Sequence, residues 1–94
     1  MTIDWSERAL DDLDAIIFHV AAENVTSALW MDSDISRRVD LLSDFPSMGR
    51  PGRISGTREL VVSRSRCVVL YRLDDDMVRI LRVVHGAQEW PNSI

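Results

Sequence analysis

The run CVVLYRLDDDMVRILRVVH, residues 67–85, decides the fold predicted for this chain. Both ends of the run are rich in Val, Ile, Leu and Tyr, and three aspartates at positions 74–76 separate them. Short β-prone runs joined by a few polar residues are typical of antiparallel strands, and short Asp side chains tolerate turn conformations. We therefore predict strands at residues 66–73 and 77–85, covered on at least one face because they are almost continuously apolar.

A third strand is predicted before this hairpin, at residues 57–62, from the same residue types. Residues 46–56 hold two of the three prolines and three of the four glycines, so we expect a loop there. Farther toward the N-terminus, the spacing of the apolar residues changes from that of strands to that of helices. Apolar residues recur at three- and four-residue steps over 9–21 and 28–45, as in amphipathic helices. A short connection between them predicts an antiparallel helical hairpin.

Capping residues predict where each helix begins and ends. Ser6 is a good N-cap for the first helix, and Thr26 is the expected N-cap of the second. Pro46 ends the second helix, because the residue before a proline avoids the helical region. With a short strand at residues 3–5, the predicted class is α+β in the order β-α-α-β-β-β. We expect one domain over residues 1–94, with the helical hairpin packed on one face of a small, mostly antiparallel sheet.

Composition excludes several kinds of protein. No apolar run approaches the roughly 18 residues that a membrane span needs, so no membrane partner is expected. The N-terminal residues MTIDWSERAL carry acids and no apolar stretch, so no secretory signal is expected. The one cysteine, Cys67, cannot form an internal disulfide. Together these features predict a cytoplasmic protein.

Charge is distributed unevenly along the chain. Residues 1–48 hold three arginines and ten acids, a balance of −7, whereas residues 49–94 hold eight arginines and five acids, a balance of +3. All eleven basic residues are arginine, whose planar fork suits carboxylates and phosphates. A basic half of this kind is typical of a protein that binds phosphate or an acidic protein.

Six residues of the basic half are candidates for binding a macromolecular target. They are Arg58, Arg64, Arg66, Arg82, His85 and Trp90. An unperturbed imidazole titrates near neutral pH, and tryptophan is enriched among interface anchors. Structural roles remain open beside these: Arg58 can pair with a carboxylate, His85 can bond to backbone at a strand end, and Trp90 can anchor the C-terminal segment to the domain.

Other charged residues are expected to have structural roles. The three-residue spacing of Arg79 and Arg82 places them on opposite faces of a strand, unless a bulge intervenes. Arg50 and Arg53 in the loop, and Asp12 on the first helix, are expected to face water. Neither histidine has a Cys or His at ligand spacing, so no metal site and no cofactor is expected.

The chain resembles the RelE/ParE toxins of bacterial type II toxin–antitoxin systems, sometimes called plasmid stabilisation proteins. The resemblance rests on five segments in the family's order. These are W-S-x-x-A-x-x-D-L at 5–13, D-F-P-S-M-G-R-P-G-R at 44–53, G-T-R-E-L-V-V at 56–62, V-L-Y-R-L-D-D-D at 69–76 and I-L-R-V-V-H-G-A-Q-E-W at 80–90.

The resemblance implies a small α+β toxin that a cognate antitoxin neutralises, and that reaches operator DNA only through the antitoxin. It leaves two targets open. ParE-like members bind DNA gyrase and inhibit it, whereas RelE-like members enter the ribosome and cleave mRNA. A third possibility is an inactive member that acts mainly as an antitoxin-bound co-repressor.

Set against the RelE-like pattern, this chain lacks most of the residues implied for cleavage. Glu59 and Val61 stand where lysines are expected, and Val68 and Gln88 stand where arginines are expected. No tyrosine lies C-terminal of Tyr71. If the chain were a nuclease, Arg58, Arg82 and His85 would have to replace the usual set. We therefore expect a toxin that binds gyrase and is not an enzyme.

Overall fold

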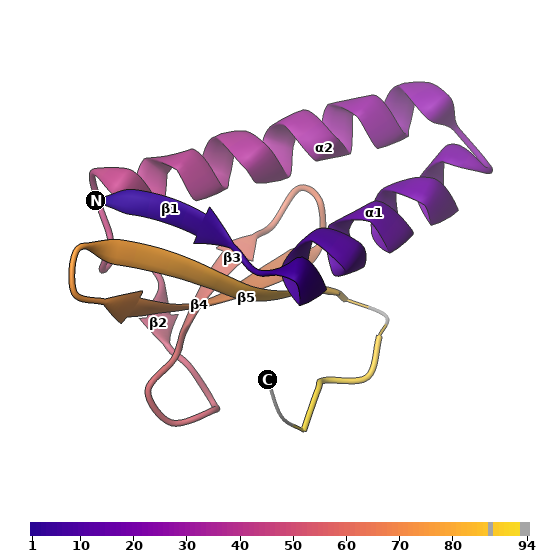
Figure 1. The fold of residues 1–94 in the computed structure, drawn as a ribbon. Coiled ribbons are helices and arrows are strands. Elements are labelled where there is room, and N and C mark those ends of the chain that lie inside the picture. The colour runs from indigo at the N-terminus through magenta and orange to yellow at the C-terminus, as the bar shows by residue number, and fades with distance from the viewer. Residues whose placement is uncertain (87, 93–94) are drawn as a thin grey trace.

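Two helices cover one side of a small sheet in this computed structural model, which describes residues 1–86 and 88–92 (Figure 1). The C-terminal segment lies on the other side. Along the chain the elements are β1 (Thr2–Trp5), α1 (Glu7–Ala21), α2 (Val25–Asp40), the 3₁₀ turn η1 (Leu41–Ser43), β2 (Arg50–Pro51), β3 (Arg58–Val62), β4 (Cys67–Asp74) and β5 (Met77–His85). The predicted α+β class is confirmed.

Within the described residues the sheet has five strands in the order β1-β5-β4-β3-β2. β1 runs parallel to β5, and the other neighbours are antiparallel, as a mostly antiparallel sheet requires. β2 lies inside the segment predicted to be loop. Its two residues pair with the start of β3, and Pro51 is tolerated there because a proline at a sheet edge need not donate to a neighbour.

Both helices begin at a side-chain cap, but one cap differs from the prediction. Ser6 Oγ accepts a hydrogen bond from Ala9 N at 3.1 Å, as expected for α1. The cap of α2 is Asn24, whose Oδ1 accepts from Ser27 N at 3.0 Å, so the prediction of Thr26 was wrong. Asn is as good an N-cap as Thr and stands two residues earlier, which adds half a turn to the helix.

The end of α2 also differs from the prediction. The helix stops at Asp40 and tightens into η1, and Leu42 turns fully into the core. Phe45, expected on the buried face, lies beyond this turn and is 60% exposed. The 3₁₀ turn has three residues per turn instead of 3.6, so the helical period no longer predicts which side chains face the sheet.

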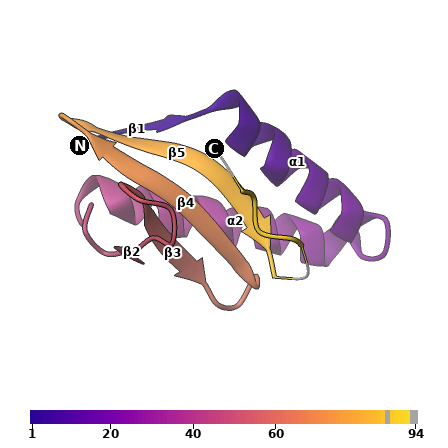
Figure 2. The ribbon, with the colours of Figure 1, turned by 90° about the horizontal axis from the view of Figure 1, so that it is seen from below.

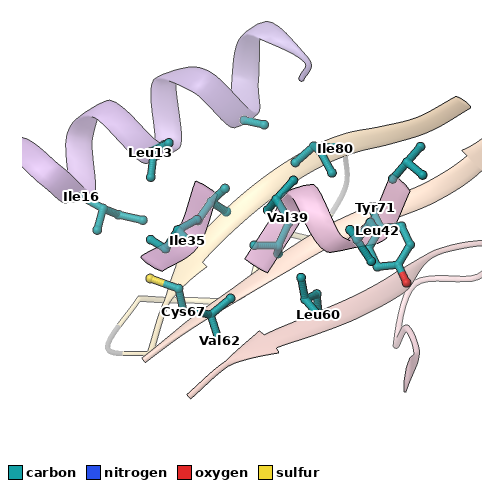
Figure 3. Close-up of a cluster of buried hydrophobic side chains, with 14 of the residues drawn as sticks. Leu13, Ile16, Ile35, Val39, Leu42, Leu60, Val62, Cys67, Tyr71 and Ile80 are labelled. Carbon is teal, nitrogen blue, oxygen red and sulfur yellow. The ribbon is translucent and has the colours of Figure 1, made fainter. Parts of the chain in front are cut away.

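The main core lies between the helices and the sheet, and Tyr71 closes one end of it (Figure 3). Its hydroxyl donates to Pro46 O at 2.7 Å and accepts from Gly49 N at 2.9 Å, which ties the segment after η1 to β4. Burial raises the pKa of Tyr71. Gly49 is required at this contact, because a Cβ there would lie 2.6 Å from the Tyr71 oxygen.

Cys67, at the start of β4, also lies in this core and is 1% exposed. Burial raises the pKa of its thiol to about 11, with a smaller contribution from the nearby charge of Asp34. The thiol therefore stays protonated at neutral pH, and the residue packs as a small apolar side chain.

A β-bulge in β5 changes which way its arginines point. Tyr71 pairs with Ile80 whereas Leu70 pairs with Arg82, so Leu81 is the extra residue. Because two residues then oppose one, Arg82 shares a face with Leu70 and Leu81. Arg79 faces the same way, since it pairs with Arg72 two positions farther along β4. Both arginines therefore lie on the side of the sheet away from the helices.

Where β1 ends, side chains of α1 continue the hydrogen bonding of β5. Ser6 Oγ donates to Leu81 O at 3.1 Å. Asp12 Oδ2 accepts from Val83 N at 2.9 Å and from Arg82 Nε at 2.7 Å, and Asp12 Oδ1 accepts from Arg82 Nη2 at 3.1 Å. The expectation that Asp12 faces water was therefore wrong. The partners lie some 70 residues away in sequence, so no local pattern could have shown the contact.

Replacing Asp12 by alanine should destabilise the protein, because Arg82 and the Val83 N–H lose their acceptor while partly buried. We expect the free energy of unfolding to fall by about 2–3 kcal/mol in a chemical denaturation experiment. Asp11→Ala is the matched control, since it makes the same change at an exposed neighbour on the same helix. Equal stabilities of the two variants would show that the carboxylate does not hold α1 to β5.

Candidate functional site

The side of the sheet turned away from the helices, called the open face below, carries most of the arginines of the strands. Figure 2 looks at the molecule from this side and shows the C-terminal segment crossing the end of β5. The open face has a small apolar centre and three groups of charged residues. The apolar centre consists of Leu70, Leu81 and Val84, with Ile54, Val68 and Trp90 packed against it.

Trp90 anchors the C-terminal segment on this apolar centre. Its ring also faces Arg53, whose Cζ lies 3.5 Å from the ring centroid in a cation–π contact. The indole Nε1 is buried and has no hydrogen-bond partner among the described residues. Anchoring was one of the two roles expected for Trp90, and its role in binding a target stays a prediction.

Glu59 sits beside this centre, at a position where the resemblance implied a lysine. Its side chain is buried, and its carboxylate accepts from Arg50 Nη2 at 2.9 Å, from Arg53 Nε at 3.2 Å and from Arg53 N at 2.9 Å. Burial raises the pKa of Glu59, but the hydrogen bonds from Arg53 and Arg50 outweigh it and lower that pKa below its usual value. Arg50 and Arg53 were expected to face water, and their side chains are 55% and 53% exposed, but their pairing with Glu59 was not expected.

The other arginines of the open face also pair with carboxylates. Arg79 donates to Asp4 at 3.0 Å and to Asp74 at 3.3 Å, and Arg72 Nε lies 2.9 Å from Asp74. The hydrogen bond from Arg72 is the main reason why the pKa of Asp74 is lowered. Arg82 pairs with Asp12, and this hydrogen bond raises the pKa of the guanidinium. Folding therefore neutralises much of the positive charge that the sequence concentrates in its C-terminal half.

Arg58, Arg82 and His85, the set considered for RNA cleavage, are not brought together. Arg58 pairs with Tyr71 and His85 pairs with Cys67, so about 13 Å of β4 separates them. Arg58 Nη1 donates to Gly49 O at 2.7 Å and to Ser47 O at 3.3 Å. Arg82 lies on the open face, whereas His85 borders α1 on the helix side. These three side chains cannot act on one phosphate in this arrangement.

His85 instead lines a cleft between α1 and the end of β5. The cleft has a volume of about 350 Å³ and a mostly apolar lining, made by Ala15, Ile16, His19, Val20, His85 and Gln88. The backbone N–H of His85 donates to Gln88 Oε1 at 2.7 Å. Across residues 1–86 and 88–92, no group of three or more His, Cys, Asp or Glu side chains is placed to hold a metal ion. The cleft is therefore shaped for an apolar side chain.

Arg64 and Arg66 lie in the turn between β3 and β4. They belong neither to the charged groups of the open face nor to the lining of the cleft beside His85. Arg64 Cζ lies 5.4 Å from the ring centroid of Trp30 on α2. Arg66 has a φ of 56°, in the left-handed region. Neither arginine forms an ion pair with any residue that the structure describes. The six candidate target-binding residues thus occupy several separate places, and the structure does not gather them into one site.

The pairing of Glu59 predicts a pH dependence of stability. Its pKa is lower in the folded state, so its contribution is complete above about pH 4.5 and is lost as the pH falls further, because the unfolded chain binds the proton first. Glu59→Gln should lower the free energy of unfolding at pH 7 and flatten its decline in acid, as measured by urea denaturation from pH 7 to 3. Glu23→Gln, at an exposed position, should keep the wild-type profile. Parallel profiles of wild type and Glu59→Gln would contradict the assignment.

The chain matches known toxins over almost its whole length. A family model described as the ParE toxin of the type II toxin-antitoxin system, parDE, matches residues 3–90. A relative from Sinorhizobium fredii, named putative toxin Y4kP, is 40% identical over 92 residues, which cover 98% of this chain and 95% of the relative. Toxin RelE2 from Caulobacter vibrioides is 33% identical over 89% of this chain and 93% of its own. Neither helix within the described residues is long and apolar enough to cross a membrane.

Solved structures agree with these relatives. The chromosomal ParDE toxin-antitoxin system of P. aeruginosa matches with a TM-score of 0.81 and 31% identity, over 90% of this chain and 95% of that one. The RelBE2 toxin-antitoxin complex of Mycobacterium tuberculosis matches with a TM-score of 0.57 and 30% identity, over 89% and 95% of the two chains. The order of segments, the fold and these likenesses agree, and the chain therefore belongs to the ParE toxin family of type II toxin–antitoxin systems.

Proposed function

We propose that this toxin acts by binding and inhibiting DNA gyrase, and that it does not cut RNA. The observation that supports this most is the separation of Arg58, Arg82 and His85. Cleavage of RNA needs a group to activate the 2′-hydroxyl, a cation to stabilise the phosphate and an acid to protonate the leaving oxygen, all around one phosphorus atom.

Each of these three side chains already has a different environment, and His85 lines the cleft beside α1. Arg82 is paired with Asp12, and Arg58 is bonded to the carbonyl oxygens of Gly49 and Ser47. On the open face, Glu59 stands at a position where the RelE-like pattern has a lysine, and its carboxylate is buried. A carboxylate in that place repels a phosphate and is itself committed to Arg50 and Arg53. The closer structural agreement with the ParDE system than with the RelBE2 complex also supports the gyrase branch.

We further propose that a cognate antitoxin binds on the helix side. The apolar cleft between α1 and β5 offers a pocket for an anchoring side chain. Phe18 on α1 and Leu29 on α2 are strongly exposed large apolar residues, which a partner could cover. A segment that is disordered alone and folds on binding can cover such a divided surface. Both structural neighbours come from toxin–antitoxin systems, which supports a partner of this kind.

The proposal predicts inhibition of purified DNA gyrase. A molar excess of the toxin should block supercoiling of a relaxed plasmid, and toxin mixed beforehand with its antitoxin should not. In parallel, mRNA on translating ribosomes should stay intact with the wild type and with His85→Ala. Cuts in mRNA that disappear in the His85 variant would instead establish the nuclease alternative, and normal growth after induction without antitoxin would support the co-repressor.

Trp90 provides a sharper version of this assay. If the open face and the C-terminal segment bind the target, Trp90→Ala should raise the toxin concentration needed for half inhibition about 10-fold or more, as for a central interface anchor. Phe45→Ala is the control, because it also removes an aromatic side chain but lies after η1, outside the open face and the C-terminal segment. Equal inhibition by the two variants would place the gyrase contact elsewhere.

A further inference from the structure

Folding leaves positive charge without a carboxylate partner at one corner of the molecule, around the turn from Ser63 to Arg66. In the described part of the chain, the other arginines of residues 49–94 bond to carboxylates or, for Arg58, to backbone carbonyls. Arg64 and Arg66 bond to neither through their side chains. This corner is therefore the place where the excess charge of the basic half can act on a partner.

The turn is held rigidly against α2. Ser65 Oγ donates to Asp34 Oδ2 at 2.7 Å, and both side chains are buried. Arg66 N donates to Ser63 O at 3.1 Å to close the turn, and Arg66 O accepts from Gly86 N at 2.7 Å. The guanidinium groups of Arg64 and Arg66 thus extend from a fixed backbone, which lowers the entropy cost of binding.

The backbone of Arg66 adopts a conformation that glycine would adopt more easily. Its φ of 56° lies in the left-handed region, which glycine and asparagine occupy at little cost and arginine does not. Asp75, in the turn between β4 and β5, has a φ of 51°, so this backbone conformation is a feature of both hairpin turns. Gly56, by contrast, is a glycine at a φ of 80°.

Two more arginines extend this corner along α2. The contacts Arg38 Nη2 to Val61 O, Asp34 to Ser65 and Trp30 to Arg64 show that one flank of α2 follows the edge of β3 into the turn. Arg37 lies on the same flank, and its side chain is 68% exposed. Its Nη2 donates a hydrogen bond to Asp34 Oδ1. Arg38 Nε is buried and has no hydrogen-bond partner among the described residues. We call Arg37, Arg38, Arg64 and Arg66 the arginine ridge.

The part of α2 that runs along the ridge is long enough to face several phosphates of one DNA strand. Residues 30 to 38 span eight helical steps, or about 12 Å along the axis of α2. Neighbouring phosphates of one DNA strand advance about 3.4 Å along the duplex, so this length faces roughly three to four of them. The acid in contact with the ridge, Asp34, is buried and already bonded to Ser65 and Arg37. Asp34 therefore offsets one of the four positive charges of the ridge.

We propose that the arginine ridge binds the phosphate backbone of duplex DNA. Guanidinium groups bind phosphate oxygens through two parallel N–H donors, and the ridge carries four guanidinium groups on α2 and the turn before β4. Arg64 covers a face of Trp30, so this tryptophan holds the guanidinium in place instead of offering a free ring to a single-stranded base. The toxin thereby gains a DNA contact of its own, unlike the expectation that it reaches DNA only through an antitoxin.

Fluorescence anisotropy with a labelled 24-base-pair duplex of mixed sequence tests the proposal, using the full toxin chain at several salt concentrations. The wild type should bind with an affinity that falls steeply with salt. The double variant Arg64→Gln with Arg66→Gln should bind at least 10-fold more weakly in 100 mM salt. Its slope of log affinity against log salt should be shallower by about 1.8, as expected when two phosphate contacts are lost.

Arg8→Gln with Arg72→Gln is the matched control, because it removes the same charge from exposed positions away from the ridge. This control should bind DNA like the wild type. Equal losses in the two double variants, or no binding of the duplex by the wild type, would overturn the proposal. So would a polyglutamate peptide that displaces the duplex at equal charge concentration, since the ridge would then be a site for an acidic protein.

Arg66→Gly separates folding from binding. Glycine adopts the left-handed backbone without strain, so the melting temperature should rise or stay the same while the affinity for the duplex falls. The arginine is then shown to serve binding at the cost of stability. An affinity equal to that of the wild type would remove Arg66 from the ridge, and a lower melting temperature would show that its side chain supports the fold.

Discussion

The contact of Asp12 with Arg82 and Val83 N holds the helical layer to the sheet at the point where β1 ends. Among the residues that the structure describes, no strand pairs with β5 on that side beyond Ile80, and Ser6 Oγ and Asp12 supply hydrogen bonds there instead. The bulge at Leu81 places Arg82 on the open face, and from there its guanidinium pairs with Asp12 beside the end of β1. The same contact removes Arg82 from the charges available to a partner.

Much of this fold could be predicted from the sequence, because hydrophobic period is a local property. The change from helical to strand period placed two helices and three antiparallel strands in the right order. The wrong predictions concern features that the hydrophobic period does not determine, namely the cap and the end of α2 and the short strand β2. Asn24 and Thr26 are both acceptable caps, Phe45 lies beyond a change of helix type, and β2 is held by two backbone pairs.

The candidate site was less predictable, because its properties depend on pairs far apart in the chain. Glu59 looked like a lone acid in a basic half, yet two arginines bury and neutralise it. For the same reason, the net charge of residues 49–94 overstated the positive charge that this half presents to a partner. Asp4 and Asp12 of the acidic half neutralise Arg79 and Arg82. What the sequence did contain was the list of arginines, and only the fold separates those that stabilise the sheet from those at the turn before β4.

The single buried thiol of Cys67 has a practical consequence. Since it is almost inaccessible and resists ionisation, an alkylating reagent can modify it only in molecules whose sheet has opened. The rate of alkylation therefore measures how often β4 leaves the core, at one atom and without an introduced label. A bound protein or nucleic acid that favours the closed sheet would slow this reaction, so the native chain reports on its own association through one buried sulfur atom.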